Sequence, residues 1–422
     1  MKRFAFLSWL LAISVFVSAQ TKDVYVLLKP DRVFDGEQMQ TGWVVLVKNN
    51  MIEEAGPMTF KLPARTAIMD LKGCTLLPGL IEGHSHLFLH PYNETSWNDQ
   101  VLTESRAERT ARAVNHARAT LSAGFTTVRD LGTEGCMYDD VGLKHAIEKN
   151  VIPGPRMMVA TRAIVARGTY GPKTDNPDIN LPQGAAEVAG IEGLTEEIRT
   201  QMGKGADLIK IYADFPYGTK SKEALPTFSV EALTWAAEIA RNGGRPLVAH
   251  ATSAEGMRRA ALAGATTIEH GDEGTAAVFK LMKEKGVAYC PTLAAGEAYA
   301  TYEGWRKGID PEPERVTKKR NAFRLALESG VTICMGGDVG VFPHGDNARE
   351  LEIMVDYGMK PLDVLRSATS VNATVFGYGD KIGRIKKGLL ADLITVEGDP
   401  TTDIKLMRKV KLVMKDGVVY QE

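Results

Sequence analysis

Eight apolar, strand-like runs alternate along the middle of this 422-residue chain with longer stretches that are compatible with helices. This alternation is typical of β-α units in a parallel sheet. Eight units predict an α/β fold, the (β/α)8 TIM barrel, whose active site lies at the carboxyl ends of the strands. The runs are residues 75–80, 126–131, 156–164, 208–212, 246–251, 266–270, 288–293 and 332–335.

The two ends of the chain share a different pattern, in which short β-like runs are separated by turn signals such as Asp35-Gly36 and Asp416-Gly417. Neither end has enough apolar residues to form a core alone. We therefore expect residues 20–70 and 381–422 to pair into one composite β-sandwich beside a barrel formed by residues 71–380.

The first nineteen residues have the features of a secretory signal peptide. Lys2 and Arg3 precede an apolar run over residues 4–17, which ends in the small residues Ser18 and Ala19. The run is shorter than the ~20 apolar residues that span a bilayer, although an uncleaved anchor is the alternative. We expect cleavage after Ala19 and a secreted or periplasmic protein with no membrane attachment.

Charge and cysteine content exclude several classes of protein. The chain has 51 Lys+Arg and 52 Asp+Glu residues, a net charge of −1, which gives no electrostatic reason to expect a nucleic-acid partner. Four cysteines are too few for a disulfide scaffold, and Cys290 and Cys334 are expected to be buried free thiols. The basic run at residues 315–320 is interpreted as a solvated helix face.

Four histidines and one aspartate lie at the ends of separate apolar runs. His84 and His86 are two residues apart, so in an extended segment both imidazoles point to the same side and can share an ion. His250, His270 and Asp338 each close another run. Singly, each could be a capping or hydrogen-bonded residue, but together they predict a metal site at the barrel mouth.

Lys210 lies inside the apolar run of residues 208–212, where an unpaired ammonium group is costly. Burial lowers a lysine pKa and raises the nucleophilic fraction. A neutral amine can take up carbon dioxide and become a carbamate that bridges two cations. The alternative is a lysine that extends to solvent from an edge position.

The chain resembles the amidohydrolase superfamily, in its imidazolonepropionase-like and Xaa-Pro-dipeptidase-like branch. The resemblance covers nearly the whole mature chain, and its most specific parts are the HxH segment at residues 77–86 and the return segment at residues 388–393. Further matching segments are residues 32–36, 124–130 and 344–351.

The resemblance implies a site for two divalent metal ions. His84 and His86 would bind the first with Asp338, His250 and His270 would bind the second, and carboxylated Lys210 would bridge them. Zinc is the family's usual metal and suits these ligands, although manganese and cobalt are not excluded.

Two differences from imidazolonepropionase narrow the choice of branch within the superfamily. Imidazolonepropionase proper has no bridging lysine and has a glutamate where this chain has Ser253. The presence of Lys210 and of Ser253 favours the dipeptidase-like, two-metal side.

The chemistry expected of such a site is amide hydrolysis. A water shared by two cations is acidified and supplies a bridging hydroxide. Asp338 would take the proton and return it to the leaving amine, and Tyr212 would stabilise the oxyanion or pack on the rim. Arg162, Tyr170 and His344, which lie in or beside the segments after the third and eighth runs, are candidates for binding a substrate carboxylate.

The sequence thus predicts an exported metal-dependent hydrolase of C–N bonds that cleaves small dipeptide-like (Xaa-Pro) or N-acyl amino acid substrates. A cyclic-amide hydrolase of the same fold is one alternative, and a metal-free binding or scaffold relative is another. A homo-oligomer is compatible with the sequence but not required by it.

Overall fold

The computed structural model describes residues 23–421 apart from residues 177, 219, 220 and 222. The predicted signal peptide at residues 1–19 lies outside the described residues, so its cleavage and the export of the protein stay predictions. Within the described range, none of the helices combines the length and the apolar character needed to cross a bilayer.

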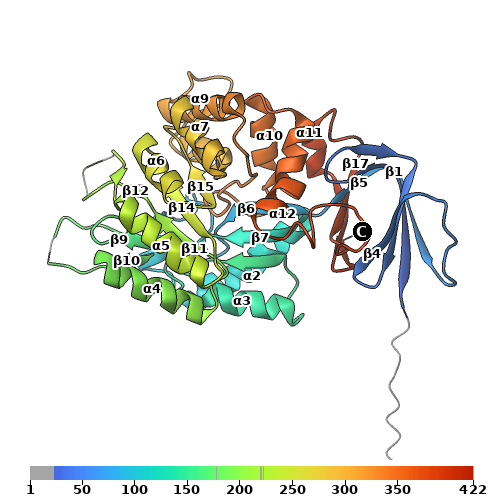
Figure 1. Ribbon diagram of the computed structural model, residues 1–422, viewed down its shortest axis with the longest axis horizontal. Helices are drawn as coiled ribbons and strands as arrows, with labels where there is room; N and C mark the ends of the chain where they lie inside the picture. The colour runs from blue at the N-terminus through green and yellow to red at the C-terminus, as the bar shows by residue number, and fades with distance from the viewer. Residues whose placement is uncertain (1–22, 177, 219–220, 222, 422) are drawn as a thin grey trace, which may run out of the picture.

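Both ends of the chain contribute to one eight-stranded sheet at one end of the molecule (Figure 1). The strand order is β19-β18-β17-β5-β1-β3-β4, with β2 beside β1. The C-terminal strand β17 pairs antiparallel with β5, which joins the two ends. The strands are β1 (Tyr25–Phe34), β2 (Met39–Thr41), β3 (Trp43–Lys48), β4 (Met51–Pro57), β5 (Ala67–Pro78), β17 (Leu393–Glu397), β18 (Val410–Lys415) and β19 (Val418–Gln421).

This sheet confirms the strands predicted at the two ends and their pairing. Leu28, Leu76 and Leu393, from three neighbouring strands, share one buried apolar cluster. A two-layered β-sandwich stays a prediction, as do the boundaries assigned to the two domains.

The middle of the chain forms parallel sheets whose strand order largely follows the chain. One sheet has the order β6-β7-β8 and the other β10-β9-β11-β14-β15-β16. Their strands are β6 (Leu80–Ser85), β7 (Phe125–Asp130), β8 (Arg156–Val159), β9 (Ile164–Ala166), β10 (Ala186–Val188), β11 (Ile209–Tyr212), β14 (Leu247–Ala251), β15 (Thr267–His270) and β16 (Ala288–Cys290).

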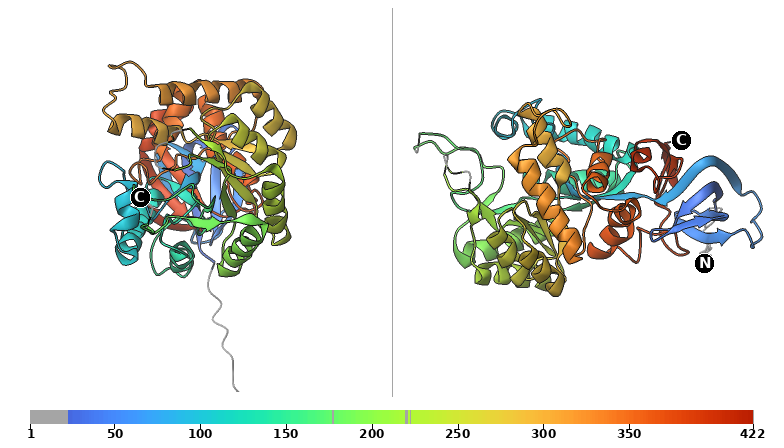
Figure 2. Two further views of the ribbon diagram at one scale, coloured as in Figure 1. Left: turned by 90° about the vertical axis from the view of Figure 1, so that its left-hand side faces the viewer. Right: turned by 90° about the horizontal axis from the view of Figure 1, so that it is seen from above.

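Helices surround these strands, as the left view of Figure 2 shows. Serine side chains cap several helix amino termini, because a hydroxyl can accept a hydrogen bond from an otherwise unpaired N–H; Ser253 does so for α6. The helices are α1 (Trp97–Leu102), α2 (Arg106–Ser122), α3 (Asp139–Glu148), α4 (Gly190–Lys204), α5 (Val230–Asn242), α6 (Ala254–Leu262), α7 (Ala276–Lys285), α8 (Leu293–Tyr302), α9 (Glu314–Ser329), α10 (Ala348–Asp356), α11 (Pro361–Arg366) and α12 (Asn372–Val375). A short antiparallel pair, β12 (Asp214–Phe215) with β13 (Leu225–Pro226), follows β11.

Four of the predicted runs differ from the structure. The seventh run ends early, because β16 stops at Cys290 and Leu293 already begins α8. Residues 75–78 belong to β5 of the terminal sheet, and the barrel-side strand starts at Leu80. The third run divides into β8 and β9, because Thr161 between them has a φ of 63°, which interrupts an extended strand. The eighth run makes only one isolated bridge, Tyr289 to Ile333, and a second bridge, Ser85 to Val339, lies just beyond it.

Those two bridges place residues 333–339 between β16 and β6. The strand order is therefore consistent with the predicted barrel, and the chain has the predicted α/β fold. A fully closed barrel stays a prediction.

Candidate metal centre

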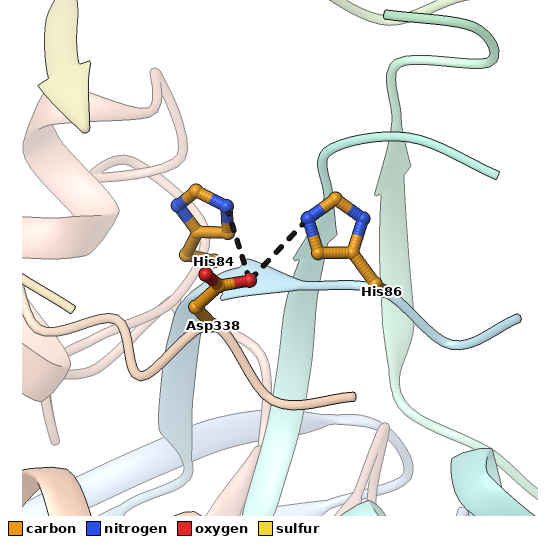
Figure 3. Close-up of side chains that lie close together, drawn as sticks. All are labelled: His84, His86 and Asp338. Carbon is orange, nitrogen blue, oxygen red and sulfur yellow. Dashed lines mark ion pairs between the residues drawn. The ribbon is translucent and has the colours of Figure 1, made fainter. Parts of the chain in front are cut away.

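Three side chains from two segments that are distant in the sequence converge, as Figure 3 shows. Nε2 of His84 lies 3.6 Å from Oδ1 of Asp338, and Nε2 of His86 lies 3.4 Å from the same oxygen. One ligand atom from each residue lies within 4.8 Å of the others. Two imidazoles and one carboxylate at this spacing match the donor types that zinc prefers.

The backbone fixes Asp338 against the end of β6. The N–H groups of Asp338 and Val339 both donate to the carbonyl of His84, at 2.9 and 3.2 Å. Asp338 has a φ of 62°, a left-handed conformation that is uncommon for a residue with a side chain and recurs at active sites. The tight connection turns the carboxylate toward both histidines.

A buried carboxylate that the sequence interpretation did not assign, Glu82, holds the two segments together. It accepts hydrogen bonds from the N–H of His84 at 3.0 Å, the N–H of Gly337 at 2.8 Å and the amide of Asn347 at 2.9 Å. Burial raises the pKa of Glu82 to about 7. The alternation of Glu82 and His84 on β6 with His86 directly after it is the sequence signal that could have identified Glu82.

The other two predicted histidines come from neighbouring parallel strands. In the register of the sheet, His250 of β14 lies beside Tyr212 of β11, and Ala251 lies beside His270 of β15. The ring centroids of His250 and His270 are 4.5 Å apart, and those of His84 and His270 are 4.9 Å apart. The four predicted histidines thus gather in one place.

Lys210 lies on β11 among these groups and is buried, with 1% of its surface exposed. Its Nζ has no hydrogen-bond partner among the described residues, and neither has Nε2 of His84 or Nδ1 of His250. Burial lowers the pKa of Lys210. Buried polar atoms are normally paired, so three unpaired donors and acceptors in one place fit a site built for metal ions and a modified lysine.

Burial disfavours the charged imidazolium form at this centre, and the neutral imidazole is the form that binds metal. Burial, followed by the nearby Lys210 ammonium, lowers the pKa of His84 and of His250 well below the ordinary value. Burial and the neighbouring His250 do the same for His270. Burial thus disfavours the charged form of Lys210 and of the surrounding imidazoles alike.

A second group of buried residues orients the His84 ring from its Nδ1 side, opposite the nitrogen that faces Asp338. Nδ1 of His84 lies 2.8 Å from Oε2 of Glu269, and Arg129 donates to the other oxygen of Glu269 at 2.8 Å. Arg129 also donates to the carbonyl of Gly83 at 2.7 Å and to the hydroxyl of Thr267 at 3.0 Å. The sequence interpretation missed both Glu269 and Arg129.

A cavity of about 510 Å³ opens over this centre. His86, His250, His270, Asp338 and Tyr212 all line it, so the predicted ligands and the predicted oxyanion donor face one space. The volume lies within the range typical of small-molecule sites.

Only one of the three residues predicted to bind a substrate carboxylate lies at the cavity. Tyr170 lines the cavity, but Arg162 and His344 are not among its lining residues. Arg162 donates to the carbonyl of Ala185 at 2.9 Å, and the His344 ring stacks on that of His116 with 4.3 Å between centroids. Both side chains make contacts away from the cavity, so this geometry does not favour Arg162 or His344 as carboxylate ligands.

The interpretation of residues 315–320 as a solvated helix face is wrong for Lys319 of α9, and Arg315 is solvated but also faces the site. Lys319 is 5% exposed and lies 2.7 Å from Oδ1 of Asp272. Arg315, one helical turn earlier, is exposed but lines the cavity, and its guanidinium lies over the ring of Tyr299 at 4.8 Å. One side of this basic helix therefore faces the site.

The expected free cysteines are confirmed, since Cys290 and Cys334 are buried and unpaired.

Comparison with known proteins identifies the family. The family model described as "Amidohydrolase family" matches residues 75–420, which is more than half of the chain. The chain belongs to the amidohydrolase family.

The relatives of this amidohydrolase match it over most of its length. Ochratoxinase of Aspergillus niger is 29% identical over 366 residues, which cover 80% of this chain and 73% of that protein. A crystal structure of a Xaa-Pro dipeptidase with methionine bound in the active site is 32% identical, with a TM-score of 0.84, over 94% of this chain and 100% of the other. A prolidase complexed with N-methylphosphonate-L-proline is 26% identical, with a TM-score of 0.82, over the same shares.

These relatives confirm that this amidohydrolase is a hydrolase acting on C–N bonds.

Proposed function

We propose that this amidohydrolase cleaves the amide bond of dipeptides of the Xaa-Pro type, or of N-acyl amino acids. The observation that carries the proposal is the gathering of four imidazoles, Asp338 and a buried Lys210, whose Nζ has no hydrogen-bond partner among the described residues, beneath one cavity. The likeness to a Xaa-Pro dipeptidase and to a prolidase supports the substrate class.

The proposed centre holds two divalent cations, with zinc as the first candidate. His84, His86 and Asp338 would hold one ion, His250 and His270 the other, and carboxylated Lys210 would bridge them. Bound cations of this kind acidify water and polarise a carbonyl group. The remaining steps are performed by side chains of this chain.

In the proposed reaction, Asp338 would transfer the proton. Burial raises its pKa above the ordinary aspartate value, while the neighbouring His86 lowers it. A carboxylate with a raised pKa is a stronger base, so Asp338 can accept a proton from the attacking water and deliver it to the leaving amine nitrogen. Its position beside His84 and His86 puts that proton at the centre of the site.

Tyr212 is placed to donate a hydrogen bond to the oxyanion. Its ring stacks on that of His250, with centroids 4.2 Å apart and planes 12° apart, which fixes its direction along the cavity wall. Burial raises the pKa of Tyr212 well above its ordinary value, so the hydroxyl stays protonated. A fixed neutral donor suits the negative charge that develops on the carbonyl oxygen.

Arg315 replaces Arg162 and His344 as the candidate for binding the substrate carboxylate. Of the cationic side chains lining the cavity, Lys319 is already paired with Asp272. Arg315 has no ion pair among the described residues and is held over Tyr299. A free guanidinium can bind a carboxylate with two parallel hydrogen bonds.

A substrate panel tests the proposed function. The purified protein, supplied with zinc and bicarbonate, would be assayed against Xaa-Pro dipeptides, other dipeptides, N-acyl amino acids, cyclic amides and the C-terminal amides of the best substrates. We expect turnover of linear substrates with a free carboxylate and weaker turnover of their amides. Turnover of cyclic amides alone would contradict the proposal.

We also propose that the protein is exported, on the strength of the N-terminal sequence. Amino-terminal sequencing of the protein from the extracellular or periplasmic fraction tests this. A mature chain starting at Gln20 is expected.

A further inference from the structure

We propose that Glu134 and the aromatic rings around it bind the free α-ammonium group of the substrate. This inference rests on the proposed function and deepens it, because an ammonium site selects unblocked dipeptides over N-acyl amino acids, which carry no such charge.

Only one of the two carboxylate oxygens of Glu134 has hydrogen-bond partners among the described residues. Glu134 follows β7, is 2% exposed and has a φ of 50°, which turns it toward the cavity that it lines. Its Oε2 accepts hydrogen bonds from the indole N–H of Trp97, at 3.0 Å, and from the hydroxyl of Tyr170. Its Oε1 is buried and has no hydrogen-bond partner among the described residues. The unused oxygen is an acceptor for a donor that the chain itself does not provide.

The basic side chains near Glu134 make their hydrogen bonds to backbone carbonyls and not to its carboxylate. Arg109 is directed at backbone carbonyls, including that of Glu134 at 2.7 Å. Nδ1 of His86 lies 3.9 Å from Oε1 of Glu134, but this nitrogen is bonded to the carbonyl of Gly132 at 2.8 Å. Among the described residues, no lysine or arginine forms an ion pair with Glu134. A bound cation would therefore be its first full charge partner.

Aromatic rings complete the site. The Tyr170 ring packs against Trp97 at 5.0 Å, Tyr212 at 4.7 Å and Phe215 at 5.0 Å between centroids. All four rings line the same cavity as Glu134. Aromatic faces beside a carboxylate form the arrangement that recognises ammonium groups, because the ring quadrupole attracts a desolvated cation.

The position of Glu134 matches the chemistry of a dipeptide. The His86 ring separates Glu134 from Asp338: Nδ1 is on the Glu134 side, and Nε2 lies 3.4 Å from Asp338. In a dipeptide, one carbon atom separates the α-ammonium nitrogen from the scissile carbonyl carbon. A substrate with its carbonyl at the proposed metal centre therefore has its ammonium group beside His86, within reach of Glu134.

A binding experiment tests the inference without requiring turnover. The metal-loaded protein would be titrated calorimetrically with L-phenylalaninamide and with N-acetyl-L-phenylalaninamide, which differ in the ammonium charge and lack a carboxylate. The wild type is compared with Glu134→Gln, which removes the charge and nearly keeps the shape, and with Glu134→Asp, which keeps the charge. Glu284→Gln, on the exposed surface of α7, is the matched control for the loss of one charge.

We expect the wild type and Glu284→Gln to bind the free amine at least about tenfold more tightly than the acetylated amide. Glu134→Gln should lose this preference, and Glu134→Asp should retain part of it. Equal affinity of the wild type for the two probes, or an unchanged preference in Glu134→Gln, would overturn the inference. Because binding is the readout, a failure of the proposed hydrolysis would appear separately, as an absence of turnover in the substrate panel.

Discussion

Nδ1 of His84 lies 2.8 Å from a carboxylate oxygen of Glu269, although the two residues are 185 positions apart in the chain. The contact directs the opposite nitrogen, Nε2, toward Asp338. Carboxylates that bond to a metal-binding histidine in this way fix its tautomer and orientation. Arg129 supplies the charge partner that makes a fully buried Glu269 tolerable.

Replacing Glu269 with Gln should weaken metal binding. The neutral amide no longer favours the proton on Nδ1 of His84, and we expect metal affinity to fall roughly 10- to 100-fold. Metal content after dialysis against a graded chelator measures the change. Glu297→Gln is a matched control, because it also removes the charge of a buried carboxylate in an ion pair, in this case with Lys307. Equal metal retention in the two variants would show that Glu269 does not support the site.

The metal-centre residues could be predicted from the sequence because each closes an apolar run. A polar residue at the end of a buried strand is conspicuous, and parallel strands bring such ends together whatever their distance along the chain. This logic located His84, His250 and His270. It also located Asp338, although the eighth run forms only an isolated bridge.

The supporting residues could not be predicted in the same way. Glu269 and Arg129 lie inside strands, and their partners are set by packing between strands far apart in sequence. Lys319 was not recognised as buried because it lies in a run of basic residues. It is three residues after Val316 and four before Phe323, and all three lie on the buried face of the helix. Helical periodicity, applied to the basic run, would have separated Lys319 from the solvated lysines.

Lys210→Ala should remove most of the activity and lower the metal content. The variant removes the buried amine that we assign as the carbamate bridge, and short carboxylic acids such as acetate or propionate should restore part of both by occupying the gap. Metal analysis and initial rates, with and without the added acid, measure the effect. Lys415→Ala, at another buried lysine in the terminal sheet, is the control. Full metal and full rate in Lys210→Ala would refute the bridging role.

Asp338→Asn should separate metal binding from turnover. An amide oxygen can still bind a cation, but an amide cannot carry the proton, so we expect much of the metal to remain while kcat falls about 100- to 10,000-fold. Asp392→Asn, which alters a buried carboxylate paired with Arg156, controls for the loss of a buried charge. An unchanged kcat in Asp338→Asn would remove Asp338 from the proton transfer.

Stability should respond to pH through Glu350. This carboxylate accepts hydrogen bonds from the N–H groups of Leu293 and Ala294 at the start of α8, and burial raises its pKa to about 8. The folded protein therefore holds the Glu350 proton more tightly than the unfolded chain, whose pKa is about 4.5. The resulting stabilisation is complete below the unfolded pKa and is lost as the pH rises through the folded pKa.

Glu350→Gln cannot titrate at this position and removes that dependence. Between about pH 5 and about pH 8, the wild type should lose roughly 3 kcal/mol of unfolding free energy relative to the variant, at about 1.4 kcal/mol per pKa unit. Urea unfolding of both proteins at the two pH values gives the difference. A free-energy difference between the two proteins that stays constant with pH would contradict the shifted pKa.

The central claim is that this amidohydrolase hydrolyses dipeptides with two metal ions held by its histidines, Asp338 and Lys210. The most direct measurement is a titration of the metal-free protein with zinc in the presence of bicarbonate, with the rate of Xaa-Pro hydrolysis followed at each step. The predicted result is a rate that rises until about two zinc ions are bound per chain and then stays level. A protein that binds no zinc, or that binds two ions and leaves every linear dipeptide intact, would contradict it.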